Sequence, residues 1–254
     1  MGILDGKTIL VTGVLTPSSI AFHVARVCLE QGAEVVLTGH GRIRLVRRVA
    51  DRLPGPPPVL ELDVTDRERL AALAQDLSHH VDGLDGVVHS IAFAPAGALN
   101  GRFLDTTWPE VATTLHTSAY SLAALTTALL PLLRRGASVV ALDFDSDRTF
   151  PEYDWMGVAK SSLASTARRL AHRLGGEGVR VNLVSAGPLR TMAGSGVGGQ
   201  SELEQTWSDS APLGWNSEDA EPTARAVAAL LSDWFPATTG ETVHGDGGFH
   251  SVAL

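Results

Sequence analysis

The sequence has 254 residues, of which 44% are hydrophobic and 19% are charged, and its formal net charge is −8. These values suit a globular enzyme, and the negative charge argues against a surface for nucleic acid or anionic membranes. Cys28 is the only cysteine, which excludes an internal disulfide and predicts a small core residue in a reducing, cytoplasmic compartment. The sequence shows neither a signal-peptide core nor an apolar run of about 18 residues, so we expect no membrane span.

Seven short apolar runs, rich in β-branched residues, have the pattern of buried parallel strands. They are residues 7–12, 34–38, 59–62, 87–90, 137–142, 179–184 and 241–244. Segments with helical periodicity separate them, at 20–31, 42–53, 66–80, 109–133, about 153–174 and 218–232. Residues 185–214 contain a cluster of glycines and predict a loop.

Strands and helices alternate from one end of the sequence to the other, without a linker or an internal repeat. This order predicts an α/β protein whose residues 1–254 form one Rossmann-type domain. We expect a doubly wound parallel sheet of about seven strands, with right-handed crossovers and helices on both faces.

Tyr153 and Lys160 stand seven positions apart in a predicted helix, so both side chains project from one face. A phenol can donate a hydrogen bond to an oxygen that gains charge, and a neighbouring ammonium can bind diol hydroxyls. Lys7 is the only other lysine in the sequence. The spacing alone is common by chance, so the surrounding segments have to support a catalytic role.

Gly13 ends the first predicted strand, and Ser18 and Ser19 precede the first helix. Backbone N–H groups at such a strand end and helix start, together with serine hydroxyls, can bind a pyrophosphate. The familiar Gly-x-Gly-x-x-Gly pattern is absent, so this loop has to be wider than usual. Taken alone, Gly13 is better explained as an ordinary turn glycine.

Asp63 directly follows the third predicted strand, where it can accept a hydrogen bond from an exocyclic amine such as that of adenine. Val64 would then pack on a ring, although Asp63 is equally compatible with a helix N-cap. The second strand ends without the usual carboxylate for a ribose 2′-hydroxyl, and Arg42 is near. These residues leave the choice between NADH and NADPH open.

Two further segments follow predicted strands at the carboxyl edge of the sheet, where ligands bind in such folds. One contains Ser90, Ile91 and Ala92, and the other contains Gly187, Leu189 and Thr191. The second segment is a rigid turn whose backbone suits a carboxamide, and Thr191 can donate to a phosphate. Both segments are also compatible with ordinary loops.

The Tyr-x6-Lys spacing and the Gly-x5-Ser-Ile-Ala loop that begins at Gly13 resemble the enoyl-acyl-carrier-protein reductase branch of the short-chain dehydrogenase superfamily. Other members of that superfamily usually place Tyr four positions before Lys, where this sequence has Met156. Further similar stretches are 16–23, 89–94, 186–191, 211–215 and 231–240. The NADH-dependent mycobacterial type is the most similar, through 4–7, 31–33, 37–39, 51–54, 60–64 and 143–145.

The resemblance implies that the chain reduces the C2=C3 double bond of trans-2-enoyl thioesters in fatty acid biosynthesis. The thioester would be carried by acyl-carrier protein or coenzyme A, the reductant would be NADH rather than NADPH, and the assembly would be a homotetramer. Tyr153 corresponds to the catalytic tyrosine, Lys160 to the ribose-binding lysine and Phe144 to a phenylalanine near the transferred hydride. The implied cofactor positions are Gly13, Ser19, Ile20, Asp63, Val64, Ser90, Ile91, Lys160 and Thr191.

One departure from the mycobacterial type lies in the predicted substrate-binding lid, around residues 191–214. The segment between Thr191 and Trp207 is short and rich in glycine, where that type has a longer apolar helix. Each buried methylene contributes about 0.8 kcal/mol, so a shorter lid favours short or medium acyl chains. The candidates for the pocket wall, which are equally compatible with core packing, are Phe144, Met156, Met192 and Trp215.

Two other functions remain open on the residues alone. A carbonyl reductase or alcohol dehydrogenase of the same superfamily usually has a serine about a dozen positions before the tyrosine, whereas Ser146 is only seven before it. An inactive dinucleotide-sensing protein is the other alternative. We expect no metal site, because no Cys/His/Asp cluster has ligand spacing, and we expect a solvated loop for Asp143, Asp145 and Asp147.

Overall fold

The computed structural model describes residues 1–192 and 194–252 and contains one seven-stranded sheet. The strand order is β3-β2-β1-β4-β5-β6-β7, and every neighbouring pair is parallel. The strands are β1 (Thr8–Val11), β2 (Glu34–Gly39), β3 (Val59–Glu61), β4 (Leu84–His89), β5 (Leu133–Asp143), β6 (Arg180–Ala186) and β7 (Thr242–Gly245). The predicted doubly wound parallel sheet is therefore confirmed.

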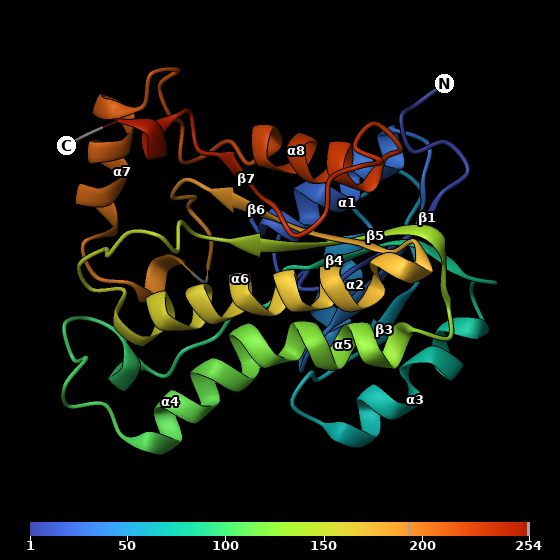
Figure 1. Cartoon of the computed structure of the whole chain (residues 1–254), viewed down its shortest axis with the longest axis horizontal. Coiled ribbons are helices and arrows are strands. Elements are labelled where there is room, and N and C mark those ends of the chain that lie inside the picture. Colours follow the sequence, from blue (N-terminus) through green and yellow to red (C-terminus); the bar gives the residue numbers. More distant parts are fainter. Residues whose placement is uncertain (193, 253–254) are drawn as a thin grey trace.

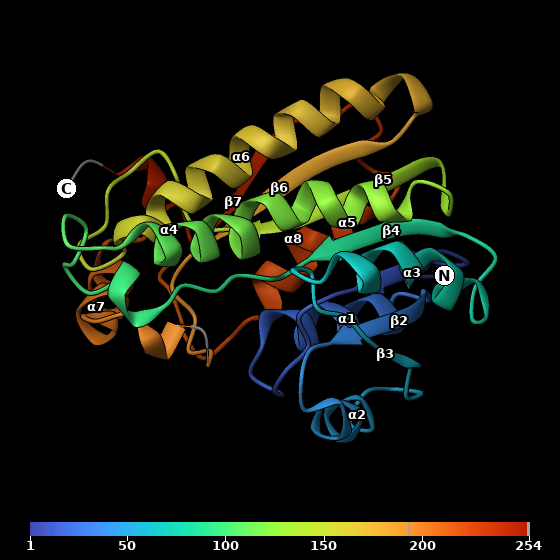
Figure 2. The same cartoon turned by 90° about the horizontal axis from the view of Figure 1, so that it is seen from below.

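Helices cover both faces of this sheet (Figures 1 and 2). One face carries α1 (Ile20–Glu30), α2 (Ile43–Ala50) and α8 (Glu221–Leu231). The other face carries α3 (Arg67–Ser78), α5 (Ser121–Leu129) and α6 (Asp154–Leu174), with α4 (Trp108–Leu115) leading into α5 through the π-helical turn His116–Tyr120. The sequence predicted α4 and α5 as one helix over residues 109–133, with an earlier end at Pro131 as the alternative. The structure has two helices, and α5 ends at Leu129, just before that proline.

The two faces of β5 separate its side chains into two hydrophobic clusters. Val140 and Leu142 belong to the cluster under α1 and α8, whereas Val139 and Ala141 belong to the cluster under α5 and α6. Because side chains alternate along a strand, Asp143 points to the same face as Ala141, under α6. This register determines which groups surround the site.

Cys28 is fully buried in α1, as the sequence predicted. Burial raises the pKa of its thiol to about 12, so the thiolate does not form near neutral pH. Its place in the core cluster with Val24 and Val27 makes it a packing residue.

The predicted loop of residues 185–214 is wrong in its second half, because α7 occupies Gln200–Ser210. The glycines end at Gly199, which has a φ of 69° and precedes the first helical residue. The helix itself contains neither glycine nor proline, and it buries Trp207 against the protein. The glycine-rich composition before the helix obscured the helical segment that follows.

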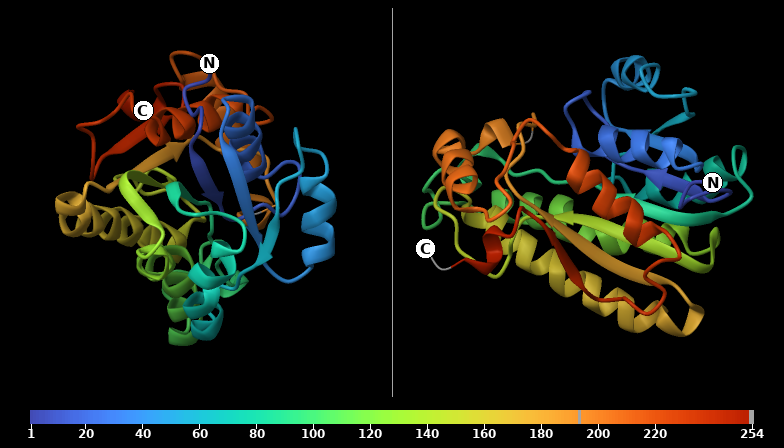
Figure 3. Two further views of the ribbon diagram at one scale, coloured as in Figure 1. Left: turned by 90° about the vertical axis from the view of Figure 1, so that its right-hand side faces the viewer. Right: turned by 90° about the horizontal axis from the view of Figure 1, so that it is seen from above.

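The carboxyl ends of the strands, the N-terminal end of α6, the helix α7 and the C-terminal turn all lie at one end of the molecule (Figure 1). Helix α2 lies away from α6, at the β3 edge of the sheet (Figure 3). Among the described residues, we find no helix with the length and apolarity needed to cross a membrane.

Candidate active site

Tyr153 is the residue that immediately precedes α6, and its backbone is held by strained neighbours. Glu152 and Asp154 have positive φ angles of 66° and 36°, which residues other than glycine rarely adopt. Asn100 N donates to Glu152 O at 2.9 Å, and Arg102 N donates to the Asp154 carboxylate at 2.9 Å. Such strain persists only where the surroundings enforce it, so the loop at residues 100–102 fixes the direction of Tyr153.

Lys160 lies in α6, which begins one residue after Tyr153, and is almost completely buried, with 6% of its surface exposed. Its Nζ donates a hydrogen bond of 2.8 Å to Leu142 O, at the carboxyl end of β5. This bond uses one of the three ammonium donors and leaves two for other oxygens. Burial lowers the pKa of Lys160, while the nearby Asp143 carboxylate acts in the opposite direction and favours the ammonium.

The Tyr153 ring packs against Phe144, with their centroids 5.1 Å apart, and it also contacts the cluster that contains the buried Met156. Burial raises the pKa of Tyr153, and the neighbouring Asp143 carboxylate raises it further. The phenol therefore remains protonated at neutral pH and acts as a hydrogen-bond donor.

Asp143, the last residue of β5, is 5% exposed, and neither of its carboxylate oxygens has a hydrogen-bond partner among the described residues. Burial raises its pKa to about 6, although Lys160 acts to lower it. The predicted solvated loop is thus wrong for Asp143 and also for Asp145, which is 7% exposed. The position of Asp143 directly after an apolar strand was the signal in the sequence that it faces the carboxyl edge.

Asp143→Asn is expected to flatten the pH dependence of stability. The pKa of Asp143 is about 6 in the folded protein against an ordinary value of 3.8, so the folded state binds more protons between these values. The contribution of Asp143 to the free energy of unfolding is therefore present below about pH 4 and lost as the pH rises through about 6. The slope is at most about 1.4 kcal/mol per pH unit. Urea unfolding of both proteins at several pH values measures it, and equal slopes would contradict the assignment.

The loop after β1 has the geometry of an anion-binding site. Gly13 has a φ of 85°, and a Cβ at this position would lie 1.9 Å from Ser90 O, so only glycine fits between the ends of β1 and β4. The Ser19 hydroxyl caps α1 by accepting from Phe22 N at 3.3 Å, and the first turn of α1 holds no acidic residue. Backbone N–H groups at this uncompensated helix start suit a pyrophosphate, so the residues fit the predicted dinucleotide.

Asp63 lies at the carboxyl edge after β3, and it does not cap α3, because that helix is capped by Asp66. Asp63 Oδ1 accepts from the backbone and the hydroxyl of Thr65, at 2.8 and 2.7 Å. Although partial burial acts to raise the pKa of Asp63, the two hydrogen bonds from Thr65 hold it below its ordinary value. Val64 is buried in the core cluster against which Ile91 packs, whereas Ala92 is exposed.

The loop after β6 is held by two tryptophans. A Cβ on Gly187 would lie 2.7 Å from Trp215 and 2.8 Å from Trp207, so both indoles press on its backbone. Trp215 Nε1 donates to Pro188 O at 2.7 Å. Further along the loop, buried Leu189 shares a cluster with Ile20, and the Thr191 hydroxyl accepts from Gly194 N at 3.1 Å.

Phe144 is the centre of an aromatic cluster that the sequence did not predict. Its ring centroid lies 4.7 Å from that of Phe150, 5.6 Å from that of Trp207 and 5.1 Å from that of Tyr153. Phe249 stacks on Trp207, with 3.6 Å between the ring centroids. Of the other predicted pocket residues, Met156 lies beside Tyr153, Trp215 covers the loop after β6, and Met192 is 57% exposed.

A family model described as enoyl-(acyl carrier protein) reductase matches residues 13–250. The chain belongs to this reductase family. Over its whole length it is 49% identical to the enoyl-acyl-carrier-protein reductase (NADH) of Mycolicibacterium smegmatis, of which it covers 99%. It is also 49% identical to the protein of that name from Mycobacterium avium and 42% identical to one from Neisseria meningitidis, covering 99% and 98% of them. The predicted resemblance to the mycobacterial type is confirmed.

The structure brings the predicted site residues at the start of α6 together with the carboxylate of Asp143, for which the sequence had predicted a solvated loop. Tyr153, Lys160 and Phe144 meet around the buried Asp143 at the carboxyl end of β5. In residues 1–192 and 194–252 we find no group of three or more His, Cys, Asp or Glu side chains that could hold a metal ion. Ser146 offers no strand-end hydroxyl, because it lies three residues beyond β5.

Proposed function

We propose that this chain reduces the C2=C3 double bond of trans-2-enoyl thioesters with NADH, in fatty acid biosynthesis. The observation that carries the proposal is the group formed by the partly buried Tyr153 and the buried Lys160 and Asp143 where β5 meets α6. Its relatives from three organisms carry the name enoyl-acyl-carrier-protein reductase (NADH), which supports this substrate class and reductant.

Bound NADH supplies the hydride that is added to C3 of the enoyl thioester. Negative charge would then gather on the thioester oxygen as an enolate, and the Tyr153 hydroxyl would donate a hydrogen bond to that oxygen. A proton added to C2 would complete the saturated thioester. A donor of this kind in a water-poor site contributes about 100- to 1,000-fold in rate. Burial keeps the pKa of Tyr153 high, so the donor is in its protonated form throughout the neutral range. Phe144, packed on the same ring, excludes water from the reacting atoms.

Lys160 binds the ribose hydroxyls of the cofactor with the two donors that Leu142 leaves over. The bond to Leu142 holds the ammonium in place, so Lys160 would orient the nicotinamide ribose of the bound cofactor. The remaining cofactor positions that we propose lie on the loops after the strands: Gly13, Ser19, Ile20, Asp63, Val64, Ser90, Ile91, Ala92, Gly187, Leu189 and Thr191. The names of the relatives favour NADH over NADPH.

We propose short or medium acyl chains as substrates. The alignment with the Mycolicibacterium smegmatis protein spans 267 positions against 254 residues here, so at least 13 of them have no counterpart in this chain. Trp207 of the lid helix is 1% exposed and fills the space beside Phe144 together with Phe249. These bulky rings leave less room for the acyl chain than smaller side chains would. Phe144, Met156, Met192 and Trp215 are the proposed pocket wall.

The carrier that we propose is acyl-carrier protein, as in the names of the relatives, and coenzyme A thioesters serve as its small analogues. We further propose one domain, residues 1–254, with a lid at 191–214, acting in the cytoplasm as a homotetramer. A carbonyl reductase is less well supported, because Ser146 does not end the strand. An inactive sensor is less well supported, because Tyr153 and Lys160 are both present.

The experiment is an NADH-oxidation assay with trans-2-enoyl thioesters from four to sixteen carbons, run in parallel with NADPH and with simple ketones. We expect turnover with NADH and the enoyl thioesters, and kcat/KM that falls beyond medium chain lengths. Each methylene that finds no apolar contact lowers kcat/KM by roughly fourfold. Reduction of ketones alone would favour the carbonyl reductase. A preference for the longest chains would contradict the proposed lid function.

A further inference from the structure

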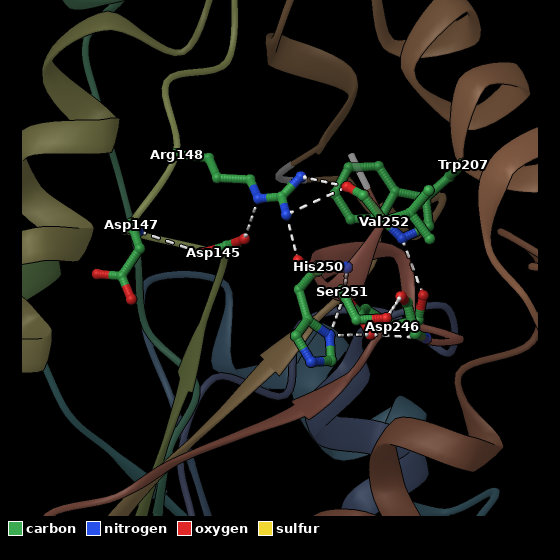
Figure 4. A network of polar contacts seen from close by, with 9 residues as sticks. Asp145, Asp147, Arg148, Trp207, Asp246, His250, Ser251 and Val252 are labelled. Carbon is green, nitrogen blue, oxygen red and sulfur yellow. Dashed lines mark hydrogen bonds and ion pairs between the residues drawn. The ribbon is translucent and has the colours of Figure 1, made fainter. Parts of the chain in front are cut away.

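The loop that carries Phe144 is fastened to the C-terminal turn by Arg148 (Figure 4). Arg148 Nη2 donates to His250 O, and both terminal nitrogens lie 3.4 Å from Val252 O. Arg148 Nε lies 3.5 Å from the carboxylate of Asp145, which is buried on the same loop. One guanidinium thus joins two segments about a hundred residues apart in the sequence.

The turn that receives Arg148 is itself rigid. Asp246 is 2% exposed, and its carboxylate accepts from Gly248 N and from His250 N, each at 2.9 Å. His250 Nδ1 lies 3.0 Å from Asp246 Oδ1, and the His250 ring stacks on His244 of β7, with 3.9 Å between the centroids. The carbonyls that Arg148 binds are therefore held in place by the end of β7.

The same turn also holds the lid helix. Trp207 Nε1 of α7 donates to Asp246 O at 3.1 Å, and the Trp207 ring stacks on Phe249. The Arg148 guanidinium lies over the other ring of this stack, 5.9 Å from the Phe249 centroid. Trp207 in turn contacts Phe144, which packs on Tyr153. The catalytic loop, the lid helix and the C-terminal turn form one connected unit.

We propose that the turn of residues 246–252 is a positioning element of the active site and that Arg148 is the positioning residue that links it to the catalytic loop. The turn holds Phe144 and Trp207 as a fixed wall for the acyl chain. Its link to the proposed cofactor loops is the contact of Trp207 with Gly187 after β6, whereas most of the proposed cofactor positions lie on other loops. The proposal rests on the reductase function proposed above. It predicts that loosening the turn impairs use of the enoyl thioester much more than NADH binding.

The test is Arg148→Met in the full chain, since methionine keeps an unbranched side chain but cannot donate to the two carbonyls. The matched control is Arg47→Met, the same substitution at an exposed arginine of α2, on the far side of the molecule (Figure 3). We expect kcat/KM for a butenoyl thioester to fall by about 10- to 100-fold, because misplaced reactants react slowly. The NADH dissociation constant should stay within about twofold of the wild type, as should every parameter of the control.

Phe249→Leu is the second variant, and it tests the positioning role of the turn if Arg148→Met does not fold. It leaves the backbone acceptors of Arg148 in place and removes the ring that stacks on Trp207. We expect it to lower kcat/KM in the same direction and to weaken the discrimination between short and long acyl chains. Unchanged enoyl kinetics in the variants, or an equal loss of NADH affinity, would overturn the proposal. Failure of the wild type to reduce any enoyl thioester would instead overturn the reductase function.

Discussion

Tyr153→Phe should lower the turnover of an enoyl thioester by about 100- to 1,000-fold while NADH affinity is retained. The substitution removes one hydroxyl and keeps the ring that packs on Phe144. The variant loses the proposed donor to the thioester oxygen, whereas the proposed cofactor contacts lie on other residues. The effect should therefore appear in kcat, with little change in the dissociation constant of NADH.

The sequence offers a matched control for this experiment, because Tyr120 is its only other tyrosine. Tyr120 is 60% exposed in the π-helical turn before α5, so Tyr120→Phe should leave the kinetics unchanged. Steady-state kinetics and NADH titration of both variants give the comparison. A Tyr153→Phe protein with wild-type turnover would remove the tyrosine from the mechanism.

Lys160→Met should weaken NADH binding by about 10- to 100-fold, the range expected for the loss of hydrogen bonds from a charged donor. The variant loses the ammonium that Leu142 O holds in place. It also leaves the buried Asp143 without its nearby cation, which raises the pKa of that carboxyl further. We therefore expect Asp143 of the folded variant to stay protonated up to a higher pH than in the wild type.

Lys7→Met is the control, because Lys7 is the other lysine and forms an ion pair at the surface with Asp233. Calorimetric titration of NADH into each variant measures the affinity, and thermal unfolding verifies that Lys160→Met is folded. Equal NADH affinity in Lys160→Met and in the wild type would exclude the ribose-binding role.

The sheet could be predicted from the sequence because its signals are local. Apolar β-branched runs such as the one at β1 form buried strands, and the helix that starts after Ser19 carries its own cap. The helix of Lys160 was predictable from its own periodicity, although it begins at Asp154 and leaves Tyr153, which we expected inside it, as the preceding residue. Helix α7 was missed because the glycines before it dominate the local composition.

The wall around the site could not be predicted, because its parts come from distant segments. Phe144 follows β5, Trp207 lies in α7, and Phe249 follows β7. Only the packing of these elements brings their rings together. Nothing near Arg148 in the sequence indicates that it reaches the carbonyl of Val252. The burial of Asp143 likewise depends on α6 crossing over the end of β5.

The most direct test of the account is to supply the wild-type protein with NADH that carries deuterium at C4 of the nicotinamide and with a trans-2-butenoyl thioester, and to locate the label in the product by NMR. The account predicts a saturated thioester with deuterium on C3, because in the proposed mechanism that carbon receives the hydride while Tyr153 binds the thioester oxygen. An absence of saturated product, or deuterium at any other carbon, would contradict it.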